Sequence, residues 1–269
     1  MDRKFFLGVG LAIVIVFAAS AVYGNIQKNS PESPDADRLY QVSTIDALML
    51  GVFDGVQTIG EVKNHGDFGI GTFHGLDGEM IVLDGIVYHA KADGSVSVAQ
   101  DHQTTPLATV TYFRNDFTTT TGAPMNFSVF SSTMENELPT GNMVYAVKMH
   151  GTFPFMKVRA IPLQEKPYPT LTDAATKQEI FTYENTTGTI VGFYTPVFFK
   201  GLNVPGYHLH YLSDDHKTGG HILDLVVPAG MTTEFDITPG FAMDLPTTGD
   251  FTGLDLSGDL SEELAKVEK

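Results

Sequence analysis

Hydrophobic residues recur along most of the chain in short runs that turn-forming residues separate. Residues 66–99 contain short β-rich runs divided by LDG, LDG and ADG, which is typical of a meander of antiparallel hairpins. Similar runs predict further strands at 108–115, 142–151 and 155–162. Beyond residue 187 they predict strands in four more segments: GTIVGFYTPVFFKG, YHLHYL, HILDLVV and TTEFDI.

Helical patterns are fewer and shorter. Residues 43–53, STIDALMLGVF, begin with a serine/threonine cap and carry apolar residues at helical spacing, so they predict a short amphipathic helix. Residues 131–139 and the charged tail LSGDLSEELAKVEK predict two more. Between residues 166 and 188 a proline-rich break precedes a capped helical stretch.

These elements predict a mixed α/β (α+β) fold in which strands dominate. We expect two β-rich subdomains with few helices. The break near residue 168 divides them into an N-terminal sheet subdomain (38–168) and a C-terminal subdomain (169–269) that carries the candidate metal site.

The N-terminus has a different pattern. Arg3 and Lys4 precede an apolar run from Phe5 to about Ala19, and small residues follow, so residues 1–24 predict a secretory signal peptide. A retained membrane anchor is the alternative. Residues 25–37 are polar and contain prolines, which predicts a flexible spacer. We therefore expect a secreted protein, with retention at the cell surface left open.

Composition narrows the classes of partner. Sixteen lysines and arginines against 32 aspartates and glutamates give a formal net charge of −16, which argues against binding to nucleic acid or to anionic membranes. An anionic substrate would need local positive charge. The chain has no cysteine, so the core or a metal ion must provide the stability that disulfides give many secreted proteins.

The segment GYHLHYLSDDHKTGGHILD (206–224) is the strongest candidate for chemistry. His208 and His210 are two apart in a strand-like run, so both side chains lie on one face. The turn-rich SDDHKTGG predicts a hairpin that returns His221 beside His210, and opposed residues have Cβ atoms about 5 Å apart. Three imidazoles at that spacing can bind one zinc ion.

Three neutral histidines would leave zinc an open position, as in catalytic sites. An isolated H-x-H is weaker evidence, because strand histidines often form hydrogen bonds at a surface. His216 is expected to be a solvated residue of the turn. Surface or hydrogen-bonded positions suffice for the remaining histidines, which are His65, His74, His89, His102 and His150.

Three blocks of the chain resemble the bacterial acetolactate decarboxylase family, from about residue 38 to the C-terminus and in the family's order. They are GIGTFHGLDGEMIVLDG, KVRAIPLQEKPYPTL and TTGTIVGFYTPVFFKGLNVPGYHLHYLSDDHKTGGHILD. The resemblance implies an enzyme that converts 2-acetolactate to acetoin and CO2 with Zn²⁺ on three histidines, which match His208, His210 and His221. It also favours a homodimer.

The resemblance further implies four catalytic or site-lining residues. They match Glu79 in the GLDGE block, Arg159 in VRAIP, Thr72 in GTF and a glutamate near the C-terminus. Glu268 is the best match for the last, with Glu262 and Glu263 as alternatives. Glu79 is expected to donate or relay a proton to an enediolate, and Arg159 to orient the substrate. Without the resemblance, Glu79 would be interpreted as an exposed hairpin carboxylate and Arg159 as a solvated strand residue.

Zinc would act as a Lewis acid and template for the developing enediolate. Two other readings remain. A zinc lyase or hydrolase that activates water, as carbonic anhydrase does, also uses H-x-H with a third strand histidine. A non-catalytic module could use the ion for folding alone.

Overall fold

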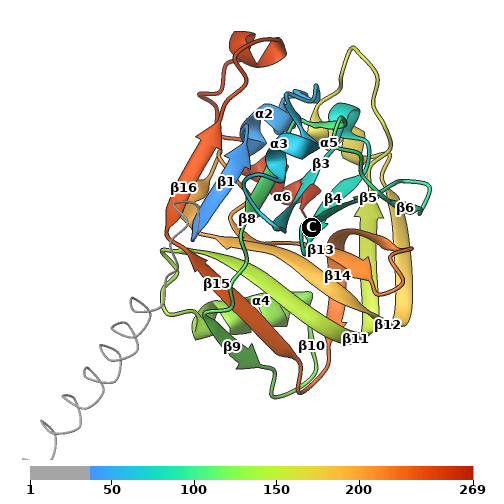
Figure 1. Cartoon of the computed structure of the whole chain (residues 1–269), viewed down its shortest axis with the longest axis vertical. Helices are drawn as coiled ribbons and strands as arrows, with labels where there is room; N and C mark the ends of the chain where they lie inside the picture. The colour runs from blue at the N-terminus through green and yellow to red at the C-terminus, as the bar shows by residue number, and fades with distance from the viewer. Residues whose placement is uncertain (1–36, 269) are drawn as a thin grey trace, which may run out of the picture. The chain divides into compact units, whose positions relative to one another are not determined.

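Two seven-stranded sheets dominate the computed structural model, which describes residues 37–268 (Figure 1). The strand-dominated mixed class is therefore confirmed. The predicted signal peptide (1–24) and almost all of the predicted spacer (25–37) lie outside the described residues. None of the helices within residues 37–268 is long and apolar enough to span a bilayer.

The first sheet contains the predicted meander. It is antiparallel except where β1 and β16 pair in parallel. Residues 66–99 form four consecutive neighbouring strands, as the turn sequences predict. The strand order is β16 (Gly240–Asp244), β1 (Arg38–Val42), β8 (Ala108–Thr111), β3 (Phe68–Thr72), β4 (Glu79–Leu83), β5 (Ile86–Ala90) and β6 (Val96–Val98).

The second sheet curves so that β11 also pairs with β14, which joins β11, β12, β13 and β14 into a closed ring of pairings. A separate two-stranded ribbon consists of β2 (Gln57–Thr58) and β7 (Thr104–Thr105). The strand order of the second sheet is β10 (Met125–Asn126), β14 (Gly219–Val227), β13 (Gly206–Ser213), β12 (Glu179–Thr195), β11 (Val144–Ala160), β15 (Thr232–Thr238) and β9 (Phe117–Thr120).

Two of these strands are longer than the sequence indicated. The strands predicted at 142–151 and 155–162 are parts of one strand, β11. Pro154 lies inside it, and the pairing with β12 omits Pro154 and Asn185, so the missing N–H does not interrupt the sheet. The predicted helical stretch after residue 170 is only α5 (Leu171–Ala175), and β12 begins at Glu179.

The expected subdomain boundary between residues 168 and 169 requires correction. It falls between β11 and β12, which are hydrogen-bonded neighbours along most of their length. The second sheet therefore combines strands from both sides of that position, and the described residues, 37–268, group as one compact unit.

Short helices flank the sheets. Thr44 caps α2 (Ile45–Met49) by accepting a hydrogen bond from the Ala47 N–H. This is the serine/threonine cap predicted for the helix at 43–53. The helix predicted at 131–139 begins earlier, because Asn126 caps it. The remaining helices, with their bounds, are α3 (Ile59–Val62), α4 (Phe127–Glu137), α6 (Ser261–Val267) and the 3₁₀ turns η1 (His74–Leu76), η2 (Val197–Phe199) and η3 (Asp250–Gly253).

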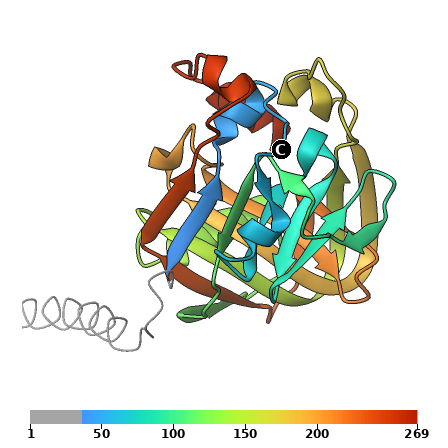
Figure 2. The ribbon, with the colours of Figure 1, turned by 45° about the horizontal axis from the view of Figure 1, so that its top comes forward.

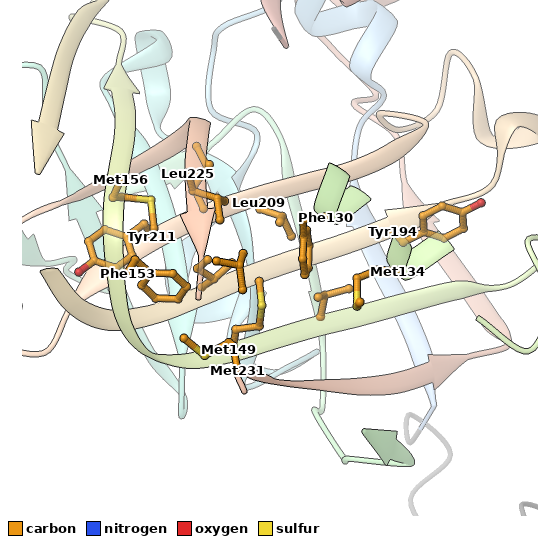
Figure 3. Close-up of a cluster of buried hydrophobic side chains, with 14 of the residues drawn as sticks. Phe130, Met134, Met149, Phe153, Met156, Tyr194, Leu209, Tyr211, Leu225 and Met231 are labelled. Carbon is orange, nitrogen blue, oxygen red and sulfur yellow. The ribbon is translucent and has the colours of Figure 1, made fainter. Parts of the chain in front are cut away.

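The two sheets pack face to face, because alternate residues of each strand contribute to a shared core. This core contains Ile70 and Ile81 from the first sheet and Phe193 and Leu212 from the second. The opposite face of the second sheet packs on α4, where Phe130 and Met134 lie near the strands (Figure 3). Helices α2, α5 and α6 share a third cluster and gather at one end of the sheets (Figure 2).

Candidate metal centre

The histidine hairpin has the predicted register. His210 of β13 lies directly opposite His221 of β14, and His208 lies two residues before His210 on the same face. Leu209 and Tyr211, on the opposite face, belong to the core under α4. The three imidazoles consequently project toward the first sheet.

The three rings converge. Each offers one ring nitrogen, and these atoms all lie within 4.8 Å of one another. His208 Nε2 is 3.1 Å from His221 Nδ1, and the ring centroids are 4.9 to 5.4 Å apart. No other group of three His, Cys, Asp or Glu residues among the described positions meets in this way.

The protein environment prepares these rings as ligands. His210 Nδ1 lies 2.9 Å from the Met80 carbonyl oxygen of β4, which can only accept, so Nδ1 carries the proton and Nε2 presents its lone pair. The Nε2 atoms of His210 and His221 are buried without a hydrogen-bond partner. Burial, aided by the charge of Arg159, lowers the pKa of His208 to about 3 and holds the pKa of His210 and His221 well below the usual value.

Glu79 reaches this centre from the first sheet. It is the first residue of β4 and lies on the same face as Ile81, which points toward the second sheet. Glu79 Oε2 is 3.7 Å from His210 Nε2. Glu79 is buried, whereas the hairpin position alone would predict an exposed carboxylate. Burial, reinforced by the nearby Glu268, raises the pKa of Glu79 to about 7 despite the opposing effect of Arg159.

Arg159 is also buried, not solvated. It lies opposite His221 in the pairing of β11 with β14. Its Nη1 donates to the Val267 carbonyl oxygen at 2.8 Å and to Gln178 Oε1 at 3.3 Å. Its Nε is 4.0 Å from Glu79 Oε1 and has no hydrogen-bond partner, so this N–H faces Glu79 with its donor unused.

The C-terminal glutamate that approaches the histidines is Glu268. It follows α6, and its Oε2 is 3.8 Å from His208 Nε2 and 3.7 Å from His221 Nε2. Its Oε1 is 3.7 Å from Arg159 Nη2, and burial raises its pKa. Glu268, and neither Glu262 nor Glu263, pairs with these groups: Glu262 is exposed and Glu263 is half-buried.

Thr72 lies beside the centre but has a local contact. It pairs with Glu79 across the β3–β4 hairpin, and its hydroxyl donates to the Gly78 carbonyl oxygen at 2.7 Å. This bond supports the turn that delivers Glu79. His216 is in the β13–β14 turn near Tyr88, as expected for a turn residue.

Three contacts of the centre were not predicted from the sequence. Gln178 accepts from Arg159, and the carbonyl oxygens of Met80 and Val267 accept from His210 and Arg159. Backbone carbonyls carry no side-chain signal, and Gln178 is a polar residue in a charged turn. No pattern in the sequence distinguishes it.

The donor set suits a transition metal. Three neutral imidazoles with converging ring nitrogens can occupy three positions of a tetrahedral zinc ion and leave a fourth for water or substrate. The carboxyl groups of Glu79 and Glu268 and the guanidinium of Arg159 lie 3.7 to 4.0 Å from one another or from the imidazoles. Such a site can stabilise negative charge and transfer a proton.

A family model described as alpha-acetolactate decarboxylase matches residues 39–258. The chain belongs to that family. The resemblance seen in the sequence is thereby confirmed, and the chain is an enzyme of the carboxy-lyase class.

Relatives within the alpha-acetolactate decarboxylase family are similar over most of their length. A protein of that name from Methanosarcina mazei is 50% identical over 234 residues, which is 87% of this chain and 81% of the relative. A crystal structure of alpha-acetolactate decarboxylase from Bacillus subtilis superposes with a TM-score of 0.83 at 37% identity, over 86% of this chain and 99% of that one. A Staphylococcus aureus protein described as similar to the family gives a TM-score of 0.79 at 34% identity.

Proposed function

We propose that the protein decarboxylates 2-acetolactate to acetoin and CO2 at the centre formed by His208, His210 and His221, with Zn²⁺ as its metal. The observation that carries this proposal is the convergence of three buried, neutral imidazoles beside Glu79 and Arg159 in a member of this family.

The reaction leaves an electron pair on the carbon that loses CO2. The adjacent ketone of the substrate accepts that pair, giving an enediolate, so no organic cofactor is required. Bound to the three imidazoles, zinc would supply Lewis-acid stabilisation of the negative charge that develops on the ketone and hydroxyl oxygens.

Glu79 is the proposed proton donor. A carboxyl with a pKa of about 7 is partly protonated at neutral pH, whereas an ordinary glutamate is almost fully ionised. Glu79 gives its proton to the carbon from which CO2 departs and regains one from water in the next turnover. Its place at the start of β4, within 4 Å of His210, favours this function.

Arg159 is proposed to orient the substrate. Gln178 and the Val267 carbonyl fix Nη1, and Nη2 lies near Glu268, which leaves Nε for an oxygen atom of the substrate. The guanidinium also supplies the positive charge that an anionic substrate requires in a protein of formal net charge −16.

The decisive experiment is a chelator-controlled assay. Purified protein is incubated with racemic acetolactate, and acetoin is measured before chelator, after chelator and after Zn²⁺ is restored. We expect acetoin formation that the chelator abolishes and zinc recovers. A zinc hydrolase or a metal-dependent binding module would give no enzymatic acetoin under any of the three conditions, and that result would refute the proposal.

Export and assembly belong to the same proposal. The charged, apolar and small-residue segments of residues 1–24 support secretion with cleavage, which mass analysis of the protein from its native host would test.

The family resemblance supports a homodimer, which light scattering of the purified protein would test.

A further inference from the structure

A cavity of about 700 Å³ lies beside the metal centre. Its walls come from α4, the connection between β12 and β13, β14 and α6. The lining is mainly apolar and includes Phe127, Val204, Leu223, Leu264 and Ala265. The volume is within the range of about 300 to 1,000 Å³ that small-molecule pockets occupy.

Glu268 connects this cavity to the centre. Its side chain forms part of the cavity lining and also lies within 3.8 Å of the ring nitrogens of His208 and His221. A molecule in the cavity is therefore separated from the imidazoles by the carboxylate of Glu268.

The exposed fractions of the side chains in the centre also indicate access from the side of this cavity. The side chains of His208 and Glu268 are the most exposed of the group, at 14% each. Those of Glu79, Arg159, His221 and His210 fall from 10% to 1%. The deeper residues lie toward β4 and the core shared by the two sheets.

We infer that this cavity is the route by which substrate and metal-binding small molecules reach the centre, with Glu268 between the cavity and the imidazoles. The inference rests on the proposed function for its substrate but on geometry alone for the route. A small hydroxy-keto acid would pass along the apolar wall formed by Leu223 and Ala265 and then meet Glu268 and Arg159.

Filling the cavity tests the route. Ala265 lies on α6 and faces the cavity, so Ala265→Phe should place a ring in it without removing any group of the centre. We expect kcat/KM for acetolactate to fall by about tenfold or more, with zinc content and melting temperature unchanged. Ser131→Phe narrows the cavity from α4 and should have the same effect, so a folding failure of one variant leaves the other decisive.

The matched control is Thr133→Phe. Thr133 also lies on α4 but lines a different cavity of about 260 Å³, formed mainly by threonines near β9. The Thr133→Phe variant should leave kcat/KM for acetolactate unchanged. Unchanged kcat/KM in folded, zinc-loaded Ala265→Phe and Ser131→Phe would overturn the inferred route.

A second measurement does not depend on catalysis. Zinc-loaded protein is mixed with increasing pyridine-2,6-dicarboxylate, and the slope of the zinc-release rate against chelator concentration gives a second-order rate constant. We expect Ala265→Phe to lower this constant and Thr133→Phe not to change it. If acetolactate is not a substrate, this measurement still tests the route; an equal constant in all three proteins would refute it.

Discussion

Deep burial of titratable groups distinguishes the residues of the metal centre. His210 and His221 are almost inaccessible, and Glu79 and Arg159 are nearly so. Burial favours neutral imidazole over imidazolium and carboxylic acid over carboxylate. The same physical cause therefore gives metal ligands that need no deprotonation and a glutamate that retains a proton near pH 7.

Loss of one ligand should remove the metal. His210→Ala deletes a nitrogen of the set and the bond to the Met80 carbonyl, so we expect less than one zinc per chain after dialysis and turnover reduced by more than about 100-fold. His208→Ala and His221→Ala should behave alike. His216→Ala, in the turn of the same hairpin, should keep zinc and activity. Elemental analysis with an acetoin assay measures both, and full zinc loading in all three ligand variants would exclude the assignment.

Glu79→Gln separates proton transfer from metal binding. The amide keeps the shape of the side chain but cannot donate a carboxyl proton, so we expect a kcat lower by about 100-fold with zinc retained. Glu262→Gln provides a control on an exposed glutamate. Unchanged turnover of Glu79→Gln at saturating acetolactate would rule out the proposed donor.

Arg159 and Gln178 should act as a pair. Arg159→Ala removes the substrate-orienting cation, and we expect kcat/KM to fall by about 100-fold while the thermal transition remains. Gln178→Leu removes one of the two acceptors that hold Nη1 and should cost about tenfold. Gln103→Leu loses a comparable bond, to the Gln100 N–H, far along the chain and should be neutral. Loss of the folded state in Arg159→Ala would instead indicate that Arg159 is structural.

Hairpins are the elements that assemble the centre. The β13–β14 hairpin supplies the histidines, and the β3–β4 hairpin supplies Glu79. In both, the period of two along a strand determines which residues share a face. For this reason the alignment of His208, His210 and His221 could be predicted from spacing alone, whereas their approach to Glu79 depends on how the two sheets pack.

The turn before Glu79 requires glycine. Gly78 has φ +71°, and an added Cβ would lie 2.2 Å from the Ala90 carbonyl oxygen. Gly78→Ala should destabilise the fold by about 1 to 3 kcal/mol and lower turnover, because the turn must shift and Glu79 shifts with it. Gly122→Ala, where nothing lies within 4 Å of the added atom, should change neither quantity. Urea denaturation and the acetoin assay make the comparison; equal stability of both variants would contradict the strain argument.

Long strands were the elements that sequence patterns divided incorrectly. The sequence patterns predicted separate strands at 142–151 and 155–162, yet β11 continues through Gly151 and Pro154. Local propensity could not indicate this, because the continuity of β11 comes from its pairing with β12, β14 and β15. The same pairing is why the predicted division near residue 168 failed, while the short meander of the first sheet was predicted well.

For the whole molecule, the sheet-to-sheet interface controls both function and stability. The centre lies at one part of this interface, and Asp236 of β15 lies in another, with its side chain fully buried and its Oδ1 without a partner. Burial, reinforced by Asp116 and Asp37, raises the pKa of Asp236 to about 8. Its Oδ2 accepts from the Arg114 N–H.

The sign of the resulting pH dependence follows from the raised pKa. Between the unfolded value of 3.8 and about 8, the unfolded chain releases a proton that folded Asp236 retains, so rising pH favours unfolding over this window. Asp236→Asn cannot ionise. We expect the variant and the parent to be similarly stable at pH 4. The advantage of the variant should then grow by about 1.4 kcal/mol per pH unit, to about 5 kcal/mol at pH 8.

Chemical denaturation of metal-free protein from pH 4 to 8 measures this difference without a contribution from zinc release. Asp84→Asn, at an exposed turn position with φ +51° that asparagine tolerates, is the matched control and should show no growing difference. A constant offset for Asp236→Asn across the range would mean that Asp236 is ionised in the folded protein. Because a buried carboxylate needs a partner, that outcome would require a cation or bound water at Oδ1.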